Sequence, residues 1–534
     1  MKTQVMTFSS IMKTITLLPV FLLSIPQLAV AQITPDATLG SENSSITPRV
    51  NSENESVDLI TGGATRGSSL FHSFLEFNVN HGQRVYFDNP ANINNIFSRV
   101  TGNNVSHILG TLGVYGTANL YLLNPKGIIF GKDAKLDIAG SFFATTANSF
   151  KFPDGNEFSA ANPQMPLLTM SVPVGVQFGS QPGDISSQGN LEVGKNLTFS
   201  AENVKLEGQL KAQTATLEAR QDLNIGDYTG ISLQGKAGGN INYGEIEINN
   251  TDPNITSNDP SLLLNAVGTI TGSKNISTTI PGLFVDLQAK DNINIKDISS
   301  NGGEMTLTAG GNINTQSLDS SSYSQSGTAG NGGGMTLTAG GNINTLTLNS
   351  SSRSDFETAG NGGGMTLTAG GNINTQDLFS YSISDSGTAG NGGGMTLTAG
   401  GNINTQSLQS LSQSDSGTAG NGGGMTLTAG GNINTESLDS YSESISGTAG
   451  NGGGMTLTAG GNINTESLDS YSYSKSGTAG NGGGMTLTAG GNINTQDLYS
   501  SSYSVSGTAG NGGEMTLTAG GDINTQYLIS TLNT

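Results

Sequence analysis

The sequence predicts an all-β fold, a right-handed parallel β-helix, and three observations support this prediction. A segment that begins with methionine recurs at a fixed spacing of 30 residues, apolar and polar residues alternate within each copy, and glycine-rich stretches separate the copies. The equivalent methionines are Met305, Met335, Met365, Met395, Met425, Met455, Met485 and Met515. Fixed spacing of this kind is typical of stacked supersecondary units, each of which buries its apolar face against its neighbours.

The first part of each unit has the pattern of a short strand. Met305, Leu307 and Ala309 are expected on one face, and Thr306 and Thr308 on the other, because side chains alternate across a strand. Glycines follow in every copy and predict a corner. The next apolar residue is the isoleucine of an Asn-Ile-Asn-Thr segment, which predicts a second short strand.

A third run, residues 318–324, is interpreted by comparing the copies. The positions of Leu318, Ser320, Ser322 and Ser324 hardly change from copy to copy, whereas the positions between them vary freely. We therefore expect the constant positions to face the interior and the variable positions to face solvent. Stacked serines would then form hydroxyl ladders that satisfy one another along the solenoid.

The spacing also predicts the size of the basic coil. An Asn-Ile-Asn segment at residues 292–294 precedes its counterpart at 312–314 by 20 residues, not 30. The basic coil is thus expected to contain about 20 residues, with a serine-rich extension added in the later copies. A leucine-rich repeat and a calcium-binding nonapeptide array fit the pattern less well, because the first needs a leucine-rich consensus and the second a shorter period.

Composition limits the classes of function. The chain has 534 residues with 79 glycines, 11% charged residues, no cysteine and a formal net charge of −20. Many glycines and few charges suit a fold with many tight corners and few helices. The acidic balance argues against nucleic acid and anionic membranes as partners, because both are bound through basic patches.

The N-terminus predicts export, and the rest of the chain divides into three parts. Residues 1–31 have lysines, an apolar stretch of about a dozen residues that is too short to span a bilayer, and an Ala-Val-Ala cleavage site, which indicates a signal peptide. No other segment is expected to cross a membrane as a helix. The predicted parts are 32–180, with irregular strands; 181–300, with irregular coils; and 301–534, with the eight repeats.

Several motifs within residues 32–180 resemble the N-terminal secretion domain of filamentous haemagglutinin-like exoproteins. These motifs are Phe-Asp-Asn-Pro at 87–90, Ile-Phe-Ser-Arg-Val-Thr-Gly at 96–102, Ile-Leu-Gly-Thr-Leu at 108–112, Asn-Pro-Lys-Gly-Ile-Ile-Phe-Gly at 124–131, Gly-Ser-Phe-Phe-Ala-Thr-Thr at 140–146 and Pro-Val-Gly-Val-Gln-Phe-Gly at 173–179. The fourth departs from the Asn-Pro-Asn-Gly-Ile motif of the family, with lysine in place of the second asparagine. The version of the domain is similar to those found in cyanobacteria.

The resemblance implies a two-partner secretion system. A dedicated outer-membrane transporter would recognise this domain and export the chain, which would fold outside the cell and act as a secreted or cell-surface protein. The candidate recognition residues are those of the secretion motif, which also have the composition of a turn. They are Asn124, Pro125, Lys126, Gly127 and Ile128. The resemblance further implies that residues 32–180 suffice for export.

The sequence offers little catalytic chemistry and predicts no cofactor and no metal site. His72, His81 and His107 lack the spacing of metal ligands, so structural roles are expected. Three aspartates, however, occupy the same place in successive coils and should stack one rung apart. They are Asp355, Asp385 and Asp415. Such a ledge leaves open an enzyme that acts on polysaccharide, or a weak calcium site, although solvated acids are the simpler interpretation.

The favoured function is that of an adhesin-like or matrix-like protein without enzymatic activity. The variable face of the third strand carries tyrosines, whose amphipathic rings suit glycan or protein surfaces. The candidate ligand residues are Tyr323, Tyr441, Tyr471, Tyr473 and Tyr503. A third hypothesis is an ice-binding or mineral-binding surface, formed by the threonines equivalent to Thr306 and Thr308, although threonine is also simply a good strand former.

Overall fold

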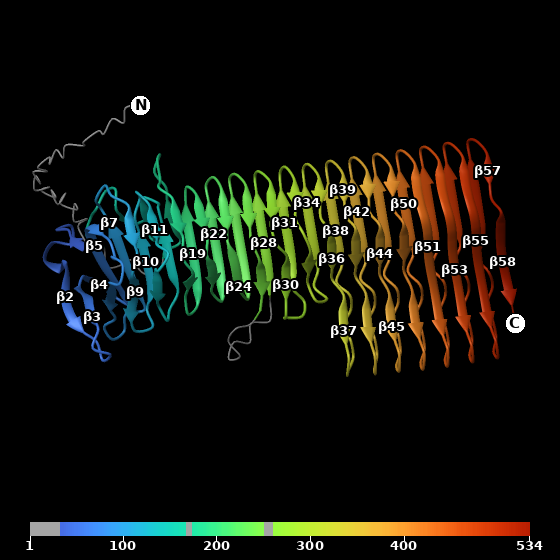
Figure 1. Cartoon of the computed structure of the whole chain (residues 1–534), viewed down its shortest axis with the longest axis horizontal. Helices are drawn as coiled ribbons and strands as arrows, with labels where there is room; N and C mark the ends of the chain where they lie inside the picture. Colours follow the sequence, from blue (N-terminus) through green and yellow to red (C-terminus); the bar gives the residue numbers. More distant parts are fainter. Residues whose placement is uncertain (1–32, 167–172, 250–259, 534) are drawn as a thin grey trace, which may run out of the picture.

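The computed structural model describes residues 33–166, 173–249 and 260–533, which form one elongated solenoid (Figure 1). Strands of successive coils pair in parallel along its length, and antiparallel pairs occur near the N-terminal end. The fold is therefore a parallel β-helix, as predicted from the repeats. The expected signal peptide lies outside the described residues. Within the described part, no helix is long and apolar enough to span a membrane.

One face of the solenoid is a continuous parallel sheet that crosses from the N-terminal domain into the repeats. Its strands are β5 (Ser69–Phe77), β7 (Asn95–Val100), β10 (Asn119–Leu123), β13 (Phe142–Thr145), β19 (Asn196–Ala201), β22 (Thr214–Ala219), β25 (Ser232–Ala237), β28 (Ser261–Ala266), β31 (Phe284–Ala289), β34 (Met305–Ala309), β38 (Met335–Ala339), β42 (Met365–Ala369), β46 (Met395–Ala399), β50 (Met425–Ala429), β52 (Met455–Ala459), β54 (Met485–Ala489) and β56 (Met515–Ala519). At the N-terminal end, β1 (Ile33–Pro35) and β4 (Ala64–Arg66) pair antiparallel with β5.

Two further columns of short strands complete each coil. The first column contains β8 (Ser106–Ile108), β11 (Ile128–Phe130), β17 (Ile185–Ser187), β20 (Val204–Leu206), β23 (Leu223–Ile225), β26 (Ile241–Tyr243), β29 (Ile270–Gly272), β32 (Ile293–Asn294), β35 (Ile313–Asn314), β39 (Ile343–Asn344), β43 (Ile373–Asn374), β47 (Ile403–Asn404) and β57 (Ile523–Asn524). The second contains β18 (Leu191–Glu192), β21 (Gln209–Lys211), β24 (Asp227–Gly230), β27 (Ile246–Ile248), β30 (Ile276–Thr278), β33 (Ile298–Ser299), β36 (Ser317–Asp319), β40 (Thr347–Asn349), β44 (Asp377–Phe379), β48 (Ser407–Gln409) and β58 (Tyr527–Asn533).

The change of coil length falls where the sequence predicts it. Val285 of β31 pairs with Met305, an offset of 20 residues, whereas Met305 pairs with Met335, an offset of 30. The ten added residues form an extension along one edge of the solenoid (Figure 1). Its strands are β37 (Ser322–Ser324), β41 (Ser352–Ser354), β45 (Ser382–Ser384) and β49 (Ser412–Ser414), and in later coils the extension is continuous with the preceding strands as β51 (Ile433–Ser444), β53 (Ile463–Ser474) and β55 (Ile493–Ser504).

This extension, which we call the serine fin, has two layers packed mainly through serines and glycines, with one small apolar side chain buried per coil, such as Ala389. Its inward serines are buried as predicted, but they do not satisfy one another, so that part of the prediction is wrong. The hydroxyl of Ser380 donates to the carbonyl of Gly363 at 2.6 Å, and that of Ser382 to the carbonyl of Gly360 at 2.6 Å. The glycine-rich return segment comes close enough to accept these bonds because it lacks side chains. A Cβ on Gly393 would lie 2.3 Å from the Ser380 hydroxyl.

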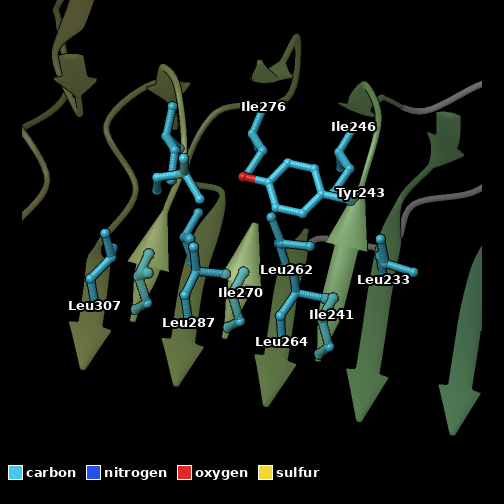
Figure 2. Packing of buried hydrophobic residues seen from close by; sticks show 14 of the residues in the cluster. Leu233, Ile241, Tyr243, Ile246, Leu262, Leu264, Ile270, Ile276, Leu287 and Leu307 are labelled. Atoms are coloured by element: carbon cyan, nitrogen blue, oxygen red, sulfur yellow. The ribbon is translucent and has the colours of Figure 1, made fainter. Parts of the chain in front are cut away.

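The interior of each coil is filled by apolar side chains from all three columns. Leu307 is fully buried, as are Ile313 and Leu318 of the same coil. In the coils before the repeats the packing is less regular, and Tyr243 places its ring among the aliphatic side chains of neighbouring strands (Figure 2). Burying one large apolar side chain stabilises the fold by about 1.5–3 kcal/mol. Each coil therefore contributes to stability through its own buried side chains.

The N-terminal domain adds two small sheets and a short helix to the solenoid. A five-stranded sheet contains β2 (Ser44–Val50), β3 (Ser56–Gly62), β6 (Arg84–Asp88), β9 (Thr111–Tyr115) and β12 (Lys135–Asp137). A three-stranded antiparallel sheet contains β14 (Ser149–Lys151), β15 (Glu157–Ser159) and β16 (Gly175–Gln177). The 3₁₀ helix η1 covers Gly40–Glu42.

Candidate functional site

The secretion motif forms a tight turn between β10 and β11. The side-chain amide of Asn124 donates to the hydroxyl of Ser106 at 2.9 Å and to the carbonyl of Asn104 at 3.1 Å. Its carbonyl oxygen accepts a hydrogen bond from the backbone N–H of Lys126 at 2.9 Å. Gly127 has a φ of 125°, which a residue with a side chain adopts only under strain. The motif therefore has the turn geometry expected from its composition.

Burial decides which motif residues are able to touch another protein in the folded chain. Asn124 is fully buried, and Gly127 and Ile128 are also buried. Lys126 is exposed and Pro125 is partly exposed. The turn also packs on the following coil, because the N–H of Gly183 donates to the carbonyl of Pro125 at 2.9 Å. In the folded state Asn124 thus holds the turn, while Lys126 and Pro125 form its outer surface.

The same domain contains a buried charged network that the sequence analysis missed. Arg99 is fully buried, and its guanidinium donates to the hydroxyls of Ser73 and Thr38 at 2.9 Å each. The guanidinium also lies 4.3 Å from the centre of the Phe158 ring, a cation–π distance. Burial lowers the pKa of Arg99 to about 10, an effect opposed by the negative charge of Asp36.

Asp36 is the acidic member of this network. Burial raises the pKa of its carboxyl, but hydrogen bonds from Thr101, Thr38 and Ser73 outweigh that effect and hold the pKa below its usual value. The Ser73 hydroxyl donates to Asp36 at 2.8 Å and accepts from Arg99, so it bridges the two charges. The sequence does contain a signal for this network: Arg99 is a charged residue within an otherwise uncharged strand, a position at which a buried partner is expected.

The tyrosine face lies on the outer side of the serine fin, as the variable positions predicted. Its five residues, named in the sequence analysis, come from four coils, because Tyr471 and Tyr473 lie in the same strand β53. Tyr441 stacks on Tyr471 with ring centres 4.6 Å apart, and Tyr473 stacks on Tyr503 at 5.7 Å. Tyr323 lies several coils away from these pairs and is 58% exposed. Its hydroxyl donates a hydrogen bond to the carboxylate of Asp355 at 2.7 Å. Stacking leaves Tyr441 and Tyr471 only partly exposed, so they are not the free solvent-facing rings that the alternation predicted.

Carboxylates beside the stacked rings have altered acidity. Burial is the main cause that raises the pKa of Asp469 to about 6, and the nearby charges of Asp439 and Asp497 act in the same direction. Burial also raises the pKa of Asp439. The face therefore carries partly buried acids among aromatic rings, and its charge changes in mildly acidic solution.

Two of the three aspartates in the ledge are paired with a cation. Arg353 lies 3.3 Å from a carboxylate oxygen of Asp355 and 3.1 Å from one of Asp385. Among the described residues, no group of three or more acidic, histidine or cysteine side chains is placed to hold a metal ion. Arg353 therefore bridges two rungs and forms an ion pair with each of Asp355 and Asp385.

The threonine positions form regular columns on the outside of the continuous sheet. Thr306 pairs with Thr336 and Thr308 with Thr338, and the same register continues through the repeats. The histidines are scattered in the N-terminal domain. His72 is buried, which lowers its pKa to about 3, and one of its ring nitrogens lies 3.0 Å from the Ser44 hydroxyl. His81 contacts Asp133 at 2.9 Å on the surface.

Taken together, the strand register and the buried turn define a parallel β-helix with an elaborated N-terminal domain. Residues 31–273 match the family model described as the TPS secretion domain, where TPS denotes two-partner secretion. The match and the motifs confirm that the chain carries a two-partner secretion domain of the filamentous haemagglutinin-like type. The match continues past residue 180, where the sequence analysis placed a boundary, and that boundary stays a prediction.

Comparison with individual proteins gives more distant relationships. The chain is 34% identical over 88 residues to a heme/hemopexin-binding protein of Haemophilus influenzae, an alignment that covers 16% of this chain and 9% of that relative. The crystal structure of the HMW1 secretion domain from Haemophilus influenzae aligns with a TM-score of 0.22 at 15% identity, covering 91% of this chain and 96% of that one. The filamentous haemagglutinin secretion domain aligns with a TM-score of 0.21 at 16% identity, covering 65% and 96%. The fold assignment rests on the strand register.

Proposed function

We propose that the chain is exported by a dedicated outer-membrane transporter and acts outside the cell as a non-enzymatic surface protein. The observation that carries the export proposal is the secretion-domain match over residues 31–273, together with the folded turn at Asn124. A β-helix suits this route, because each coil buries its faces mainly against its neighbours and coils are able to fold one after another as they emerge.

We further propose that the tyrosine face contacts glycan or protein surfaces. The stacked pairs present ring edges and hydroxyls beside acidic groups, a combination of apolar area and hydrogen-bonding capacity that suits such surfaces. The paired state of Asp355 and Asp385 favours binding over catalysis on this face. Purified protein should therefore release no products from neutral or acidic polysaccharides. Turnover that disappears in Asp385→Asn would overturn the non-enzymatic proposal.

Export is tested by truncation in cells that also express the cognate transporter. A chain that ends at Ser180 is expected to reach the medium. A chain that ends at residue 273 retains Gly183 and Asp184, which pack on the secretion turn, and should be exported at least as well. Retention of both chains in the periplasm would contradict the proposal.

A point variant tests the turn itself. Asn124→Ala removes the amide that makes three hydrogen bonds in the turn and should reduce export strongly. The matched control is Asn404→Ala in a repeat, which removes an asparagine of a regular ladder and should leave export nearly unchanged. Equal export of the two variants would show that the turn is not needed for recognition.

A further inference from the structure

A long groove runs along the repeats, and the residues that line it belong neither to the secretion domain nor to the tyrosine face. Its volume is approximately 1200 Å³, and it follows the bend between the first and second strand columns through eight coils. Six of the eight coils contribute three consecutive residues each, as Asn404, Thr405 and Gln406 do in one of them; the first coil contributes two and the last contributes four. At about 4.8 Å per rung, eight coils correspond to a groove of roughly 35 Å.

The wall of the groove is a ladder of side-chain amides. The Nδ2 of Asn434 donates to the Oδ1 of Asn404 at 2.8 Å, and the same bond recurs from Asn464 to Asn434. Each amide uses one N–H and one oxygen lone pair in this ladder, so a second N–H and a second lone pair remain. The wall thus repeats one donor and one acceptor on every rung.

The floor is a row of threonine hydroxyls, and their hydrogen bonds range from 2.7 Å at Thr315 and 3.1 Å at Thr405 to longer ones in other coils. Thr435 donates to the carbonyl of Gln406 at 3.3 Å, and Thr465 to the carbonyl of Ser467 at 3.4 Å, although such bonds are normally near 2.7–2.8 Å. Thr495 is 5% exposed, and its hydroxyl has no partner. Buried hydroxyls of this kind are costly unless something satisfies them. The floor therefore has hydrogen-bonding capacity left for a further polar group, above all at Thr435, Thr465 and Thr495.

The charges of the lining residues limit which ligands the groove is able to bind. No lysine or arginine lines the groove, and its only charged residues are Glu436 and Glu466. A polyanion such as a nucleic acid or an acidic polysaccharide would find no cation there. The opposite rim is otherwise formed by glutamines, apart from Leu346.

The backbone excludes an added peptide strand. The N–H groups at the bend are already used between rungs, as in the bonds from Gln406 to the carbonyl of Gln376 and from Thr405 to the carbonyl of Asn434. A peptide laid along the groove would run across the strands and meet no free strand edge, which is what strand addition requires. The free groups are side-chain amides and hydroxyls at a constant spacing.

We infer that this groove binds an extended, uncharged polysaccharide along the axis of the solenoid. Sugar hydroxyls both donate and accept, which matches the remaining capacity of the amide wall and the threonine floor. A polymer of identical units meets the same set of groups on each rung, so weak contacts add up along the chain. This site is distinct from the tyrosine face and does not depend on what that face binds.

The test uses the full mature chain and a soluble, uncharged β-glucan, with oligosaccharides of increasing length. Affinity should rise with length until the oligosaccharide spans the groove and then level off. The triple variant Thr405→Val, Thr435→Val and Thr465→Val removes three floor hydroxyls without changing their shape. It should weaken binding by at least about tenfold, since one hydrogen bond contributes about 1 kcal/mol and 1.4 kcal/mol is a factor of ten.

The matched control makes the same three substitutions in the same coils on the exposed threonine columns, at Thr398, Thr428 and Thr458. It should leave binding unchanged. A second groove variant, Gln406→Leu, guards against misfolding, because Leu346 occupies the equivalent position in another coil and is exposed there. It should weaken binding while leaving the thermal unfolding temperature unchanged.

Several outcomes would overturn the inference. They are absence of β-glucan binding, equal loss in the two triple variants, and preference for alginate as a polyanion or chitosan as a polycation. Tyr471→Ala separates this site from the proposed tyrosine face. Loss of β-glucan binding in that variant, with the groove variants unaffected, would place the glycan on the tyrosine face instead.

Discussion

The outward side of one continuous sheet is built in two different ways in the secretion domain and in the repeats. A single column of paired residues runs from Phe71 through Phe97, Tyr121 and Phe143 and continues into the threonines of the repeats. In the secretion domain these rings are stacked and covered by the sheet of β14, β15 and β16, which places Phe150 against them. In the repeats the equivalent threonines have no such cover and are exposed.

This difference shows two ways to stabilise a solenoid. The secretion domain folds a distant segment back over its own sheet and ties it with Arg99, whose guanidinium donates to the carbonyl of Ser159 at 3.0 Å. The repeats rely on contacts between adjacent coils, so a defect there should remain local. The secretion domain should instead respond as one cooperative unit, because its contacts join segments far apart in the sequence.

Breaking the buried charged network of Arg99 and Asp36 should cause the largest loss of stability. Arg99→Met leaves the carboxylate of Asp36 buried without its compensating charge and removes four hydrogen bonds, so we expect a loss of about 3–5 kcal/mol in the stability of this domain. Thermal unfolding and limited proteolysis measure it. The control is Arg353→Met, which removes two solvent-accessible ion pairs in the repeats and should change stability little. Similar losses in both variants would contradict the comparison.

Introducing a buried charge into one repeat should reduce stability nearly as much as Arg99→Met does, but the loss should be confined to the neighbouring coils. Leu438→Asp places an unpaired carboxylate in the core and should cost several kcal/mol, opening the coils around it without unfolding the secretion domain. Tyr441→Asp removes a stacked ring from the fin and should cost about 0.5–1.5 kcal/mol. Limited proteolysis ranks the two. Greater sensitivity of the tyrosine variant would mean that the strand faces the opposite way.

The serine fin offers a test with two neighbouring glycines. Gly393→Ala puts a methyl group 2.3 Å from the Ser380 hydroxyl and 2.2 Å from the carbonyl of Gly363, which should cost about 1–3 kcal/mol through overpacking. Gly394→Ala meets only the carbonyl of Gly424 at 3.7 Å and should be nearly neutral. Hydrogen exchange of the fin amides reports the difference. Equal exchange in the two variants would show that the layers are not in close contact.

The smallest change in stability is expected from the titration of a carboxylate on the serine fin, that of Asp469. The pKa of Asp469 is raised from 3.8 to about 6 mainly by burial, so the folded state binds this proton more tightly than the unfolded state does. The stability that this group contributes is complete below its ordinary pKa and is lost as the pH rises through about 6. Asp469→Asn should flatten the stability profile between pH 4 and 6. A profile that is identical in the variant would assign the dependence to other groups.

The local sequence pattern was sufficient to predict the coil and the residues on its inward face. The alternation of Met305, Leu307 and Ala309, the switch from a 20-residue to a 30-residue period, and the constant positions of Leu318 and Ser320 all predict the observed register. These features are visible in the sequence because inward and outward positions alternate within a strand, and each coil meets an almost identical copy of itself. The secretion motifs were recognisable for a similar reason, since short turns need particular residues.

Only the tertiary structure decided what lies outside the coil. Nothing local shows that Phe150 covers Phe97, that Asn124 points inward, or that the fin serines bond to the glycine carbonyls of the neighbouring segment. The groove is also a tertiary feature, because its lining residues come from eight bends that are stacked on one another. Periodicity specifies which side of a strand is buried by its own coil. Contacts between distant segments, and the curvature of the stack, depend on how separate pieces of chain meet in space.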